Sequence, residues 1–327
     1  MKENWERTEP PADLSIEEIE ELVRPAADGR KVLSAALLGE GFSNTNYKLQ
    51  LEGGHGPYVL RLYRRDPSVA EKELEIARRL HGKVPVPNMI HMDASCTRYK
   101  SPWALMEWKE GILLRDVLKS GDSQQRVQAA AEALGKVLAD IHAHTFPTAG
   151  FLGKSLEVAE PFAMEAEAFL IFMKDSLFAN RSGYWLGEEL APSLWTFCQK
   201  HAHKLSDPED TPVLVHSDFN GLNILIAQDG GVSAVLDWEF AFAGSRLTDI
   251  ANLLRYEQKA SPFERQFIRS YEQHTGKALP GEWQLRSKLE DLIALCDMLN
   301  HSTEATPNRV FDLKRLIRRT LEYSADA

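Results

Sequence analysis

Two short apolar runs enclose a polar loop that constrains this chain more than any other segment. The runs are Val213–Val215 and Ile224–Ile226, and the loop between them holds Asp218 and, five residues later, Asn223. Another carboxylate, Asp237, ends a second apolar run a short distance downstream. Buried strands hold the ends of the loops that they flank, so we expect these three polar side chains to lie close together.

Side chains of these types meet the needs of phosphoryl transfer. That reaction requires an acceptor held in line with the phosphoryl group and a neutralised phosphate charge. Carboxylate and amide oxygens are ligands that Mg²⁺ accepts beside phosphates and water. The pattern therefore predicts that Asp218 orients an acceptor hydroxyl, while Asn223 and Asp237 hold the metal. The alternative is a pair of ordinary β-hairpins whose turns carry Asp and Asn, and the coincidence of all three residues argues against it.

The segments His216–Asn223 and Leu236–Glu239 resemble the aminoglycoside phosphotransferase family, which includes choline kinase-like and homoserine kinase-like enzymes. The usual loop of that family has glycine at the position of Ser217. Gly244 and the run Thr248–Ala251 resemble the continuation of the same pattern. The resemblance covers about two-thirds of the chain.

This resemblance implies a role for each residue of the loop. Asp218 would be the catalytic base or the residue that orients the acceptor hydroxyl, and Asn223 and Asp237 would be the Mg²⁺ ligands. His216 and Asp249 would brace the loop, because in such folds a buried carboxylate hydrogen-bonds the loop backbone.

The family is similar in fold to the protein kinases, so the resemblance implies an α+β, bilobal fold. We expect an N-terminal nucleotide-binding lobe over residues 1–107, built on a small antiparallel sheet. Residues 108–327 would form a larger, mainly helical lobe that binds the acceptor and contains two catalytic hairpins. The length of 327 residues also exceeds what one hydrophobic core usually supports.

The segment Leu38–Leu49 has the pattern of a strand, a tight turn and a second strand. Its glycines let the backbone approach phosphate groups, and Ser43 and Asn44 can donate hydrogen bonds to them. Such residues are also common in hairpin loops, and no Walker A run of Gly-Lys-(Ser/Thr) follows. The position of the segment ahead of the next elements favours nucleotide binding.

Arg61 lies in the alternating strand Tyr58–Tyr63, at the place where kinases keep a lysine. A guanidinium keeps its charge and can bind two phosphate oxygens at once, so nucleotide binding is compatible with this departure. Glu73 lies on the helical stripe of Ile76 and Leu80 and is the expected partner of Arg61. The alternative for Glu73 is an ordinary surface glutamate.

The apolar segment Pro102–Trp108 leads into a polar linker. In this fold class it is the hinge strand between the lobes, so we expect the backbone around Glu107 and Trp108 to meet the adenine edge of the nucleotide. We expect ATP, with GTP as the alternative, and Mg²⁺. A buried strand without a ligand would produce the same pattern.

Periodicity and turn residues predict the remaining elements. A helix is expected after Ser15, which can form a capping box with Glu18. Strands are expected near residues 32–39, 44–51, 57–64, 89–94 and 101–108, and helices near 68–81, 123–144, 161–180, 188–203, 247–256, 262–275, 282–301 and 308–323. The tryptophans of the helical lobe, Trp185, Trp195 and Trp283, are expected to pack in its core. If one of them stacks on a cationic acceptor, Trp185 is the first candidate, because the segment 182–185 between two of these helices has a loop-like composition.

Composition excludes several classes of protein. The net charge of -10 and a pI near 5.6 argue against nucleic-acid binding and favour a cationic small molecule. Three widely spaced cysteines, Cys96, Cys198 and Cys296, argue against a disulfide framework, so we expect a reducing cytoplasm. No run of eighteen apolar residues is present, so we expect no membrane span.

These observations predict an ATP- and Mg²⁺-dependent phosphotransferase that acts on a hydroxyl of a small molecule. Within that class the sequence favours an aminoglycoside or another amine-bearing acceptor, with homoserine, choline and sugar hydroxyls as alternatives. Protein substrates are disfavoured because no Ala-Pro-Glu segment separates Asp237 from Asp249. A kinase fold that binds nucleotide without transferring phosphate is the competing interpretation. The sequence predicts no particular oligomeric state.

Overall fold

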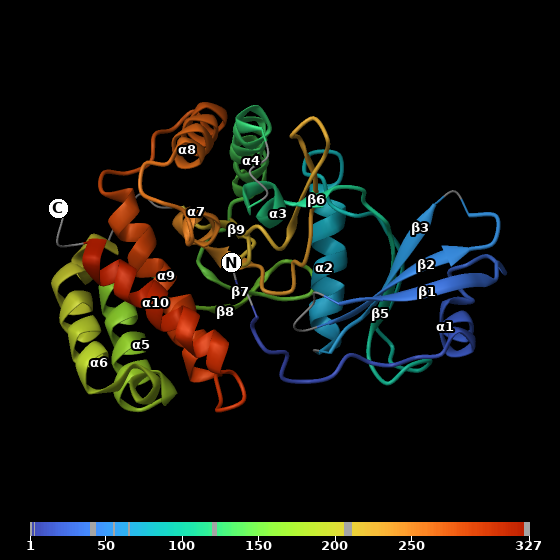
Figure 1. Ribbon diagram of the computed structural model, residues 1–327, viewed down its shortest axis with the longest axis horizontal. Coiled ribbons are helices and arrows are strands. Elements are labelled where there is room, and N and C mark those ends of the chain that lie inside the picture. The colour runs from blue at the N-terminus through green and yellow to red at the C-terminus, as the bar shows by residue number, and fades with distance from the viewer. Residues whose placement is uncertain are drawn as a thin grey trace.

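An antiparallel sheet forms the first lobe of the molecule, on the right in Figure 1. The computed structural model describes residues 2, 4–39, 44–54, 56–64, 66–119, 123–205 and 211–323. The sheet has the order β1-β2-β3-β5-β4, with β1 at Val32–Leu38, β2 at Thr45–Leu51, β3 at Pro57–Leu62, β4 at Met89–Asp93 and β5 at Trp103–Glu107. All five strands lie where the sequence predicts them.

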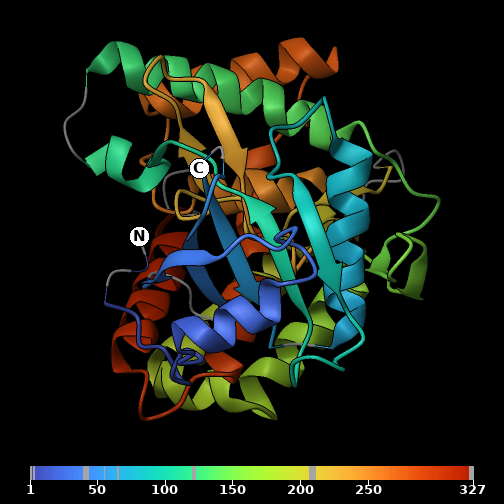
Figure 2. The ribbon, with the colours of Figure 1, turned by 90° about the vertical axis from the view of Figure 1, so that its right-hand side faces the viewer.

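Two helices cover the two faces of this sheet (Figure 2). Helix α1, Ile16–Val23, begins at the predicted capping box, in which Ser15 and Glu18 exchange hydrogen bonds between side chain and backbone. Its buried residues pack against one face in a cluster with Leu49, Leu60 and Trp103. Helix α2, Pro67–Leu80, packs on the other face through Ala70, which joins Tyr63 and Ala104. Because strand side chains alternate, Trp103 and Ala104 point to opposite faces.

Helices dominate the second lobe. They are α3 Leu114–Lys119, α4 Gln124–His142, α5 Ala166–Phe178, α6 Arg181–His201, α7 Arg246–Leu254, α8 Pro262–Thr275, α9 Trp283–Asn300 and α10 Pro307–Tyr323, with a 3₁₀ turn at Ala202–Leu205. One hydrophobic core joins α4, α7 and α8 to the short strands within residues 213–244. A second core joins α5, α6, α9 and α10. The predicted boundary after residue 107 coincides with the end of β5 and stays a prediction. No helix among the described residues is long and apolar enough to cross a membrane.

In the described part of the second lobe, seven short strands lie between the helices. They are β6 Ile112–Leu113, β7 Gly150–Leu152, β8 Val158–Pro161, β9 Val213–Val215, β10 Ile224–Ile226, β11 Val232–Val235 and β12 Phe242–Gly244. Of the two hairpins expected from the sequence, β10 and β11 form one. Strand β9 does not pair with β10, because β12 returns beside it and pairs Phe242 with Val215. The polar loop 216–223 therefore connects two different sheets and does not close a hairpin.

The region expected to be a loop at residues 182–185 is helical, so that expectation was wrong. Helix α6 begins at Arg181, and its interruption lies at Gly187, where φ is 77°. A Cβ atom on Gly183 would come within 1.9 Å of the Leu177 carbonyl oxygen. Glycine is needed at position 183 because the ends of α5 and α6 approach closely, and it does not break the helix there.

Helix α5 begins later than expected. The sequence predicts a helix from residue 161, whereas α5 begins at Ala166. Strand β8 uses the chain up to Pro161, which pairs with Gly150 of β7. This pairing holds the segment extended and delays the helix.

The contact between α4 and α8 depends on Gly135. A Cβ atom at this position would lie 2.6 Å from the Phe267 carbonyl oxygen and 2.7 Å from the Tyr271 nitrogen, both backbone atoms of α8. We expect Gly135→Ala to destabilise the protein by about 1–3 kcal/mol through overpacking, although alanine is the better helix former. Urea denaturation would measure the change. In Gly281→Ala the added Cβ meets nothing within 4 Å, so equal losses in the two variants would contradict this account.

Candidate active site

A buried carboxylate holds the loop 216–223 in place through hydrogen bonds to its backbone. Asp249, in the first turn of α7, is fully buried. Its Oδ2 accepts a hydrogen bond from the His216 amide and its Oδ1 accepts one from the Ser217 amide, both at 2.8 Å. The His142 Nε2 lies 3.2 Å from the same carboxylate. The predicted bracing role of Asp249 is confirmed by these contacts.

His216 connects this loop to the second polar segment. Its Nδ1 accepts a hydrogen bond from the Asp218 amide at 3.2 Å, and its Nε2 lies 2.9 Å from the Leu236 carbonyl oxygen. The first contact requires an acceptor at Nδ1, so the proton lies on Nε2 and is donated to Leu236. The ring also packs against Trp238, with ring centroids 4.4 Å apart. The imidazole thus fixes the distance between the Asp218 loop and the Asp237 segment.

Two residues of the site have left-handed backbone conformations. The φ angle is 70° at Ser217 and 66° at Asp237. This region is unfavourable for residues other than glycine and is populated mainly where the surroundings hold it. The Asn252 side chain contributes by donating a hydrogen bond to the Ser217 carbonyl at 3.0 Å. Strain of this kind gathers at functional sites.

Asp218 and Asn223 are in direct contact. Asn223 Nδ2 donates to the Asp218 Oδ2 at 2.7 Å and to the Asp218 backbone carbonyl at 3.0 Å. Asn220, which the sequence analysis did not select, donates to the Asp218 Oδ1 at 2.6 Å. Since the side-chain nitrogen of Asn223 faces Asp218, the side-chain oxygen Oδ1 is the atom left for another ligand.

A further contact to Asp218 comes from the start of the chain. The Lys2 Nζ lies 3.0 Å from the Asp218 Oδ1. Burial alone would raise the pKa of the Asp218 carboxyl, but the charge and hydrogen bond of Lys2, with smaller contributions from His216 and Arg255, together hold that pKa below its ordinary value. Sequence reasoning missed Lys2, because nothing in its local sequence indicates a contact more than two hundred residues away.

Arg61 joins the sheet lobe to the second polar segment. Its NH2 donates to the Glu73 Oε1 at 3.1 Å and to the Asp237 Oδ1 at 2.5 Å. Tyr63, also missed from the sequence, donates to the other oxygen of Glu73 at 2.6 Å. Burial acts against the charged guanidinium, but Glu73 and Asp237 outweigh it and raise the pKa of Arg61. The expected partner of Arg61 is therefore in contact with it, while the nucleotide roles of both residues stay predictions.

Asn44 is buried at the junction of the two lobes. Its side-chain amide donates to Glu239 Oε2 at 3.2 Å, and its Oδ1 accepts from the Arg64 amide at 3.3 Å. These bonds do not exclude a phosphate contact, because a side-chain amide has two N–H donors, and the predicted role of Asn44 stays a prediction. Ser43, the other residue expected to bind phosphate, lies outside the described residues.

Glu107 and Trp108 lie where the chain leaves the sheet. The Glu107 amide donates to the Asn88 carbonyl at 2.9 Å, so it is not available to adenine. The Lys48 Nζ lies 3.9 Å from the centre of the Trp108 ring. The prediction that this backbone binds adenine therefore concerns only the carbonyl of Glu107 and the backbone groups of Trp108, and it stays a prediction.

The geometry fits a magnesium ion beside phosphates. The Leu236 amide donates to the backbone carbonyl of Asn223 at 2.8 Å. Asn223 and Asp237 therefore lie next to each other at one end of the β10–β11 hairpin. Both offer oxygen ligands. Among the described residues, no three His, Cys, Asp or Glu side chains gather around one point. A cation here would therefore complete its shell with nucleotide phosphates and water, as Mg²⁺ commonly does.

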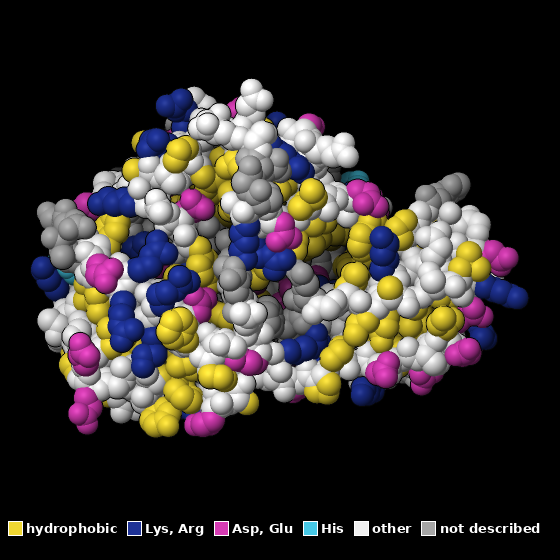
Figure 3. Space-filling model, viewed as in Figure 1, with side chains coloured by type: hydrophobic (Ala, Val, Ile, Leu, Met, Phe, Trp, Pro, Cys, Tyr) yellow, Lys and Arg dark blue, Asp and Glu magenta, His cyan; other side chains and the backbone are white. Residues whose placement is uncertain are grey.

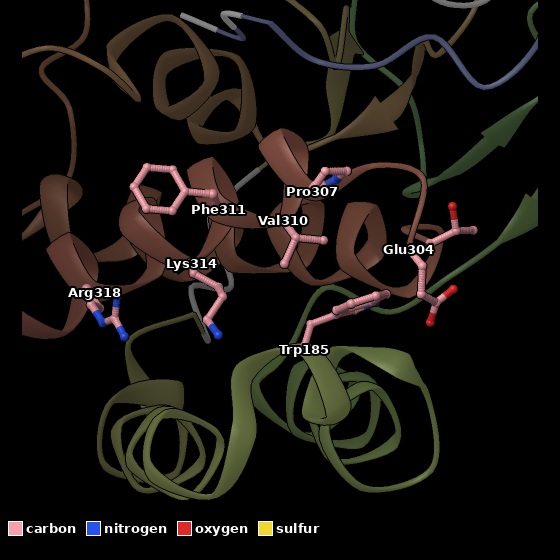
Figure 4. Close-up of a pocket in the computed structure, with 8 residues that line it drawn as sticks. Trp185, Glu304, Pro307, Val310, Phe311, Lys314 and Arg318 are labelled. Atoms are coloured by element: carbon pink, nitrogen blue, oxygen red, sulfur yellow. The ribbon is translucent and has the colours of Figure 1, made fainter.

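The surface is hollowed between the two lobes (Figure 3). A separate pocket of about 370 Å³ lies between α6 and α10 (Figure 4). It contains Trp185, whose ring packs against the Arg181 guanidinium at 5.3 Å. None of its lining residues belongs to the loop, the hairpin or the Arg61 cluster described above. The structure thus places Trp185 apart from the side chains that gather around Asp218.

Comparison with known proteins shows which family this chain belongs to. A family model described as "phosphotransferase enzyme family" matches residues 34–284, more than half of the chain. No curated protein matches the sequence significantly. The family match confirms the resemblance to aminoglycoside phosphotransferases that the loop residues indicate.

Solved structures share the fold at low sequence identity. The GDP complex of an aminoglycoside 2'-phosphotransferase-IIIa mutant has a TM-score of 0.71 and 17% identity, over 96% of this chain and 100% of that chain. A thermostable mutant of aminoglycoside phosphotransferase APH(4)-Ia with ADP and hygromycin B has a TM-score of 0.66 and 16% identity, over 93% and 98%. A candidate fructosamine-3-kinase from Thermobifida fusca has a TM-score of 0.62 and 20% identity, over 92% and 99%. These matches confirm the α+β, bilobal kinase-like fold.

The left-handed conformation at Ser217 can be tested by substitution. Ser217→Gly relieves an unfavourable φ, worth about 1–2 kcal/mol, but glycine loses about 0.5–1 kcal/mol through entropy. We therefore expect the glycine variant to stay within about 1 kcal/mol of the wild type in stability. Ser217→Val places a β-branched residue at the same φ and should cost about 1–3 kcal/mol. Thermal unfolding measures the stability of both variants. Equal stability of the valine and glycine variants would contradict the claim that the Ser217 backbone is strained.

Proposed function

Because the chain belongs to the phosphotransferase enzyme family, we propose that it uses ATP and Mg²⁺ to phosphorylate a hydroxyl group of a small molecule. The observation that carries this proposal is the convergence of Asp218, Asn223 and Asp237. They are connected by the Asn223–Asp218 hydrogen bonds and by the pairing of Asn223 with Leu236. Solved structures of the same fold with bound ADP and GDP support nucleotide use.

Each residue of the cluster has a distinct proposed task. Asp218 accepts a hydrogen bond from the acceptor hydroxyl and takes its proton as the new bond to phosphorus forms. Asn223 and Asp237 hold the Mg²⁺ ion, which neutralises phosphate charge when bound. Asp249 and His216 keep the loop in place through the bonds described above.

Arg61 is proposed to position the phosphates of the nucleotide. Its guanidinium is buried, charged and anchored by Glu73, and its Nε has no hydrogen-bond partner among the residues that the structure describes. A guanidinium can bind Asp237 and a phosphate oxygen together, because it has five N–H donors. Arg61 would thereby couple nucleotide binding to the position of Asp237.

The acceptor we favour carries an amine, in line with the charge of -10 on the chain. Solved structures of the same fold include a complex with hygromycin B and a candidate fructosamine-3-kinase. The sequence favours an aminoglycoside or another amine-bearing compound without selecting one. Homoserine, choline and sugar hydroxyls are the alternatives.

The role of Asp218 is tested by Asp218→Asn. The substitution keeps the shape of the side chain but removes the base, so we expect kcat to fall by about 10²–10⁴-fold. Turnover would be measured with ATP, Mg²⁺ and a panel of hydroxyl compounds. Asp297→Asn on the exposed face of α9 is the matched control and should keep full activity. Undiminished turnover by Asp218→Asn would exclude the assignment.

Nucleotide and metal binding are tested without an acceptor. We expect ATP with Mg²⁺ to raise the thermal midpoint more than ATP alone, and about 100 times Kd of nucleotide adds about 2.7 kcal/mol of stability. Asn223→Ala and Asp237→Ala should remove the part that depends on Mg²⁺. A fold that binds nucleotide without transferring phosphate would respond equally with and without the metal, or to neither.

A further inference from the structure

The first residues of the chain form a strap between the two lobes. We define the strap as residues 4–12; Lys2 lies two positions before its first residue. Figure 1 shows it running from the N-terminus at the centre of the molecule to the sheet. At one end the Asn308 amide of α10 donates to Glu6 Oε1 at 2.8 Å. At the other end the Ala12 amide donates to the Thr45 hydroxyl of β2 at 3.0 Å.

Further bonds fasten the strap to α10. The Trp5 Nε1 donates to Asp312 Oδ2 at 3.2 Å, and Arg309 NH2 donates to the Glu6 carbonyl at 3.2 Å. The Trp5 ring also packs against the second core of the helical lobe. These bonds build the strap into the helical lobe.

This anchoring delivers the Lys2 side chain to the catalytic loop. The Lys2 Nζ lies 3.0 Å from Asp218 Oδ1, and its backbone amide donates to the Tyr256 hydroxyl at 3.3 Å. The side chain of Lys2 is 10% exposed and that of Asp218 is 21% exposed. Removing an ammonium from water is costly unless an anion stays close to it. In this structure the anion is the carboxylate of Asp218.

The charges around the loop explain why this cation matters. The segment His216–Asn223 contains no lysine or arginine. Arg61 is bound to Glu73 and Asp237, and Arg255 is buried in a pair with Asp291 at 2.7 Å. Lys2 is the cation placed directly on the carboxylate to which the acceptor hydroxyl must bind.

The position of the reacting atoms follows from that carboxylate. An acceptor hydroxyl would lie about 3 Å from Asp218, and its oxygen would lie about 3–3.5 Å from the γ-phosphorus. A cation 3.0 Å from the same carboxylate is then next to the transferring group. When the hydroxyl takes over Asp218 Oδ1, the Lys2 ammonium needs another anion, and the equatorial oxygens of the γ-phosphate beside that hydroxyl would provide one.

We propose that Lys2 is a further catalytic residue, whose ammonium binds the transferring phosphoryl group and stabilises its charge. This inference rests on the proposed function. The acceptor oxygen forms its bond to the γ-phosphorus while the bond from phosphorus to the β,γ-bridging oxygen breaks. ADP leaves with the bonding electron pair, the hydroxyl proton passes to Asp218, and Lys2 keeps all three of its protons. Preorganised charge of this kind acts most strongly where water is excluded.

The first experiment compares Lys2→Ala and Lys2→Arg in full-length protein with the affinity tag at the C-terminus. We expect Lys2→Ala to lower kcat by about 10²–10³-fold, with a small change in the KM of the acceptor. Lys2→Arg keeps the charge and should recover part of the loss. Lys174→Ala on the exposed face of α5 is the matched control and should behave as the wild type. If Lys2→Ala raised turnover, Lys2 would be a plug that blocks the acceptor, and the proposal would be overturned.

The second experiment does not depend on turnover. Calorimetry with Mg²⁺ would compare AMP-PNP, which has a third phosphoryl group, with ADP, which lacks it. We expect Lys2→Ala to weaken AMP-PNP binding at least tenfold and to leave ADP binding unchanged. Equal effects on both nucleotides, or no effect on either, would overturn the role of Lys2. Lys2→Ala could weaken AMP-PNP binding and spare ADP binding while the wild type phosphorylates no hydroxyl compound. The proposed function would then fail, but the assignment of Lys2 to the γ-phosphate would stand.

Discussion

The carboxylate of Asp249 is the interaction on which the site depends. Burying a carboxylate is costly unless hydrogen bonds replace those it made to water. Here two successive loop amides and the His142 imidazole do so. The same bonds hold Ser217 in its left-handed conformation and direct His216 towards Leu236. Removing Asp249 would therefore release both polar segments, whereas most surface charges of this protein act only locally.

A second constraint connects the lobes. Arg61 contacts Glu73 of its own lobe and Asp237 of the other, so one buried cation is shared between two carboxylates. Lys72 adds a contact by donating to the Glu239 and Ala241 carbonyls. Together with the strap, these bonds connect the two lobes. A nucleotide entering between them would meet groups that are already positioned, which reduces the cost of ordering them on binding.

Much of this architecture could be predicted from the sequence, because strand alternation and a capping box depend on local patterns. The sheet strands, the start of α1 and the bracing role of Asp249 followed from such patterns or from the family resemblance. The pairing of β9 with β12 could not be predicted, because strand partners depend on the path of the chain between them. Gly183 was misleading, because its close contact with Leu177 is tertiary. Lys2 escaped notice for the same reason, since a lone lysine carries no signal for a distant carboxylate.

The central claim is that Asn223 and Asp237 hold one divalent cation beside the nucleotide. A crystal structure with AMP-PNP and Mn²⁺ in place of Mg²⁺ tests this most directly, because anomalous scattering locates the metal independently of the atomic coordinates. The account predicts a strong peak about 2–2.5 Å from a side-chain oxygen of each residue and from phosphate oxygens. Nucleotide density accompanied by a metal bound elsewhere, with these two side chains uncoordinated, would contradict it.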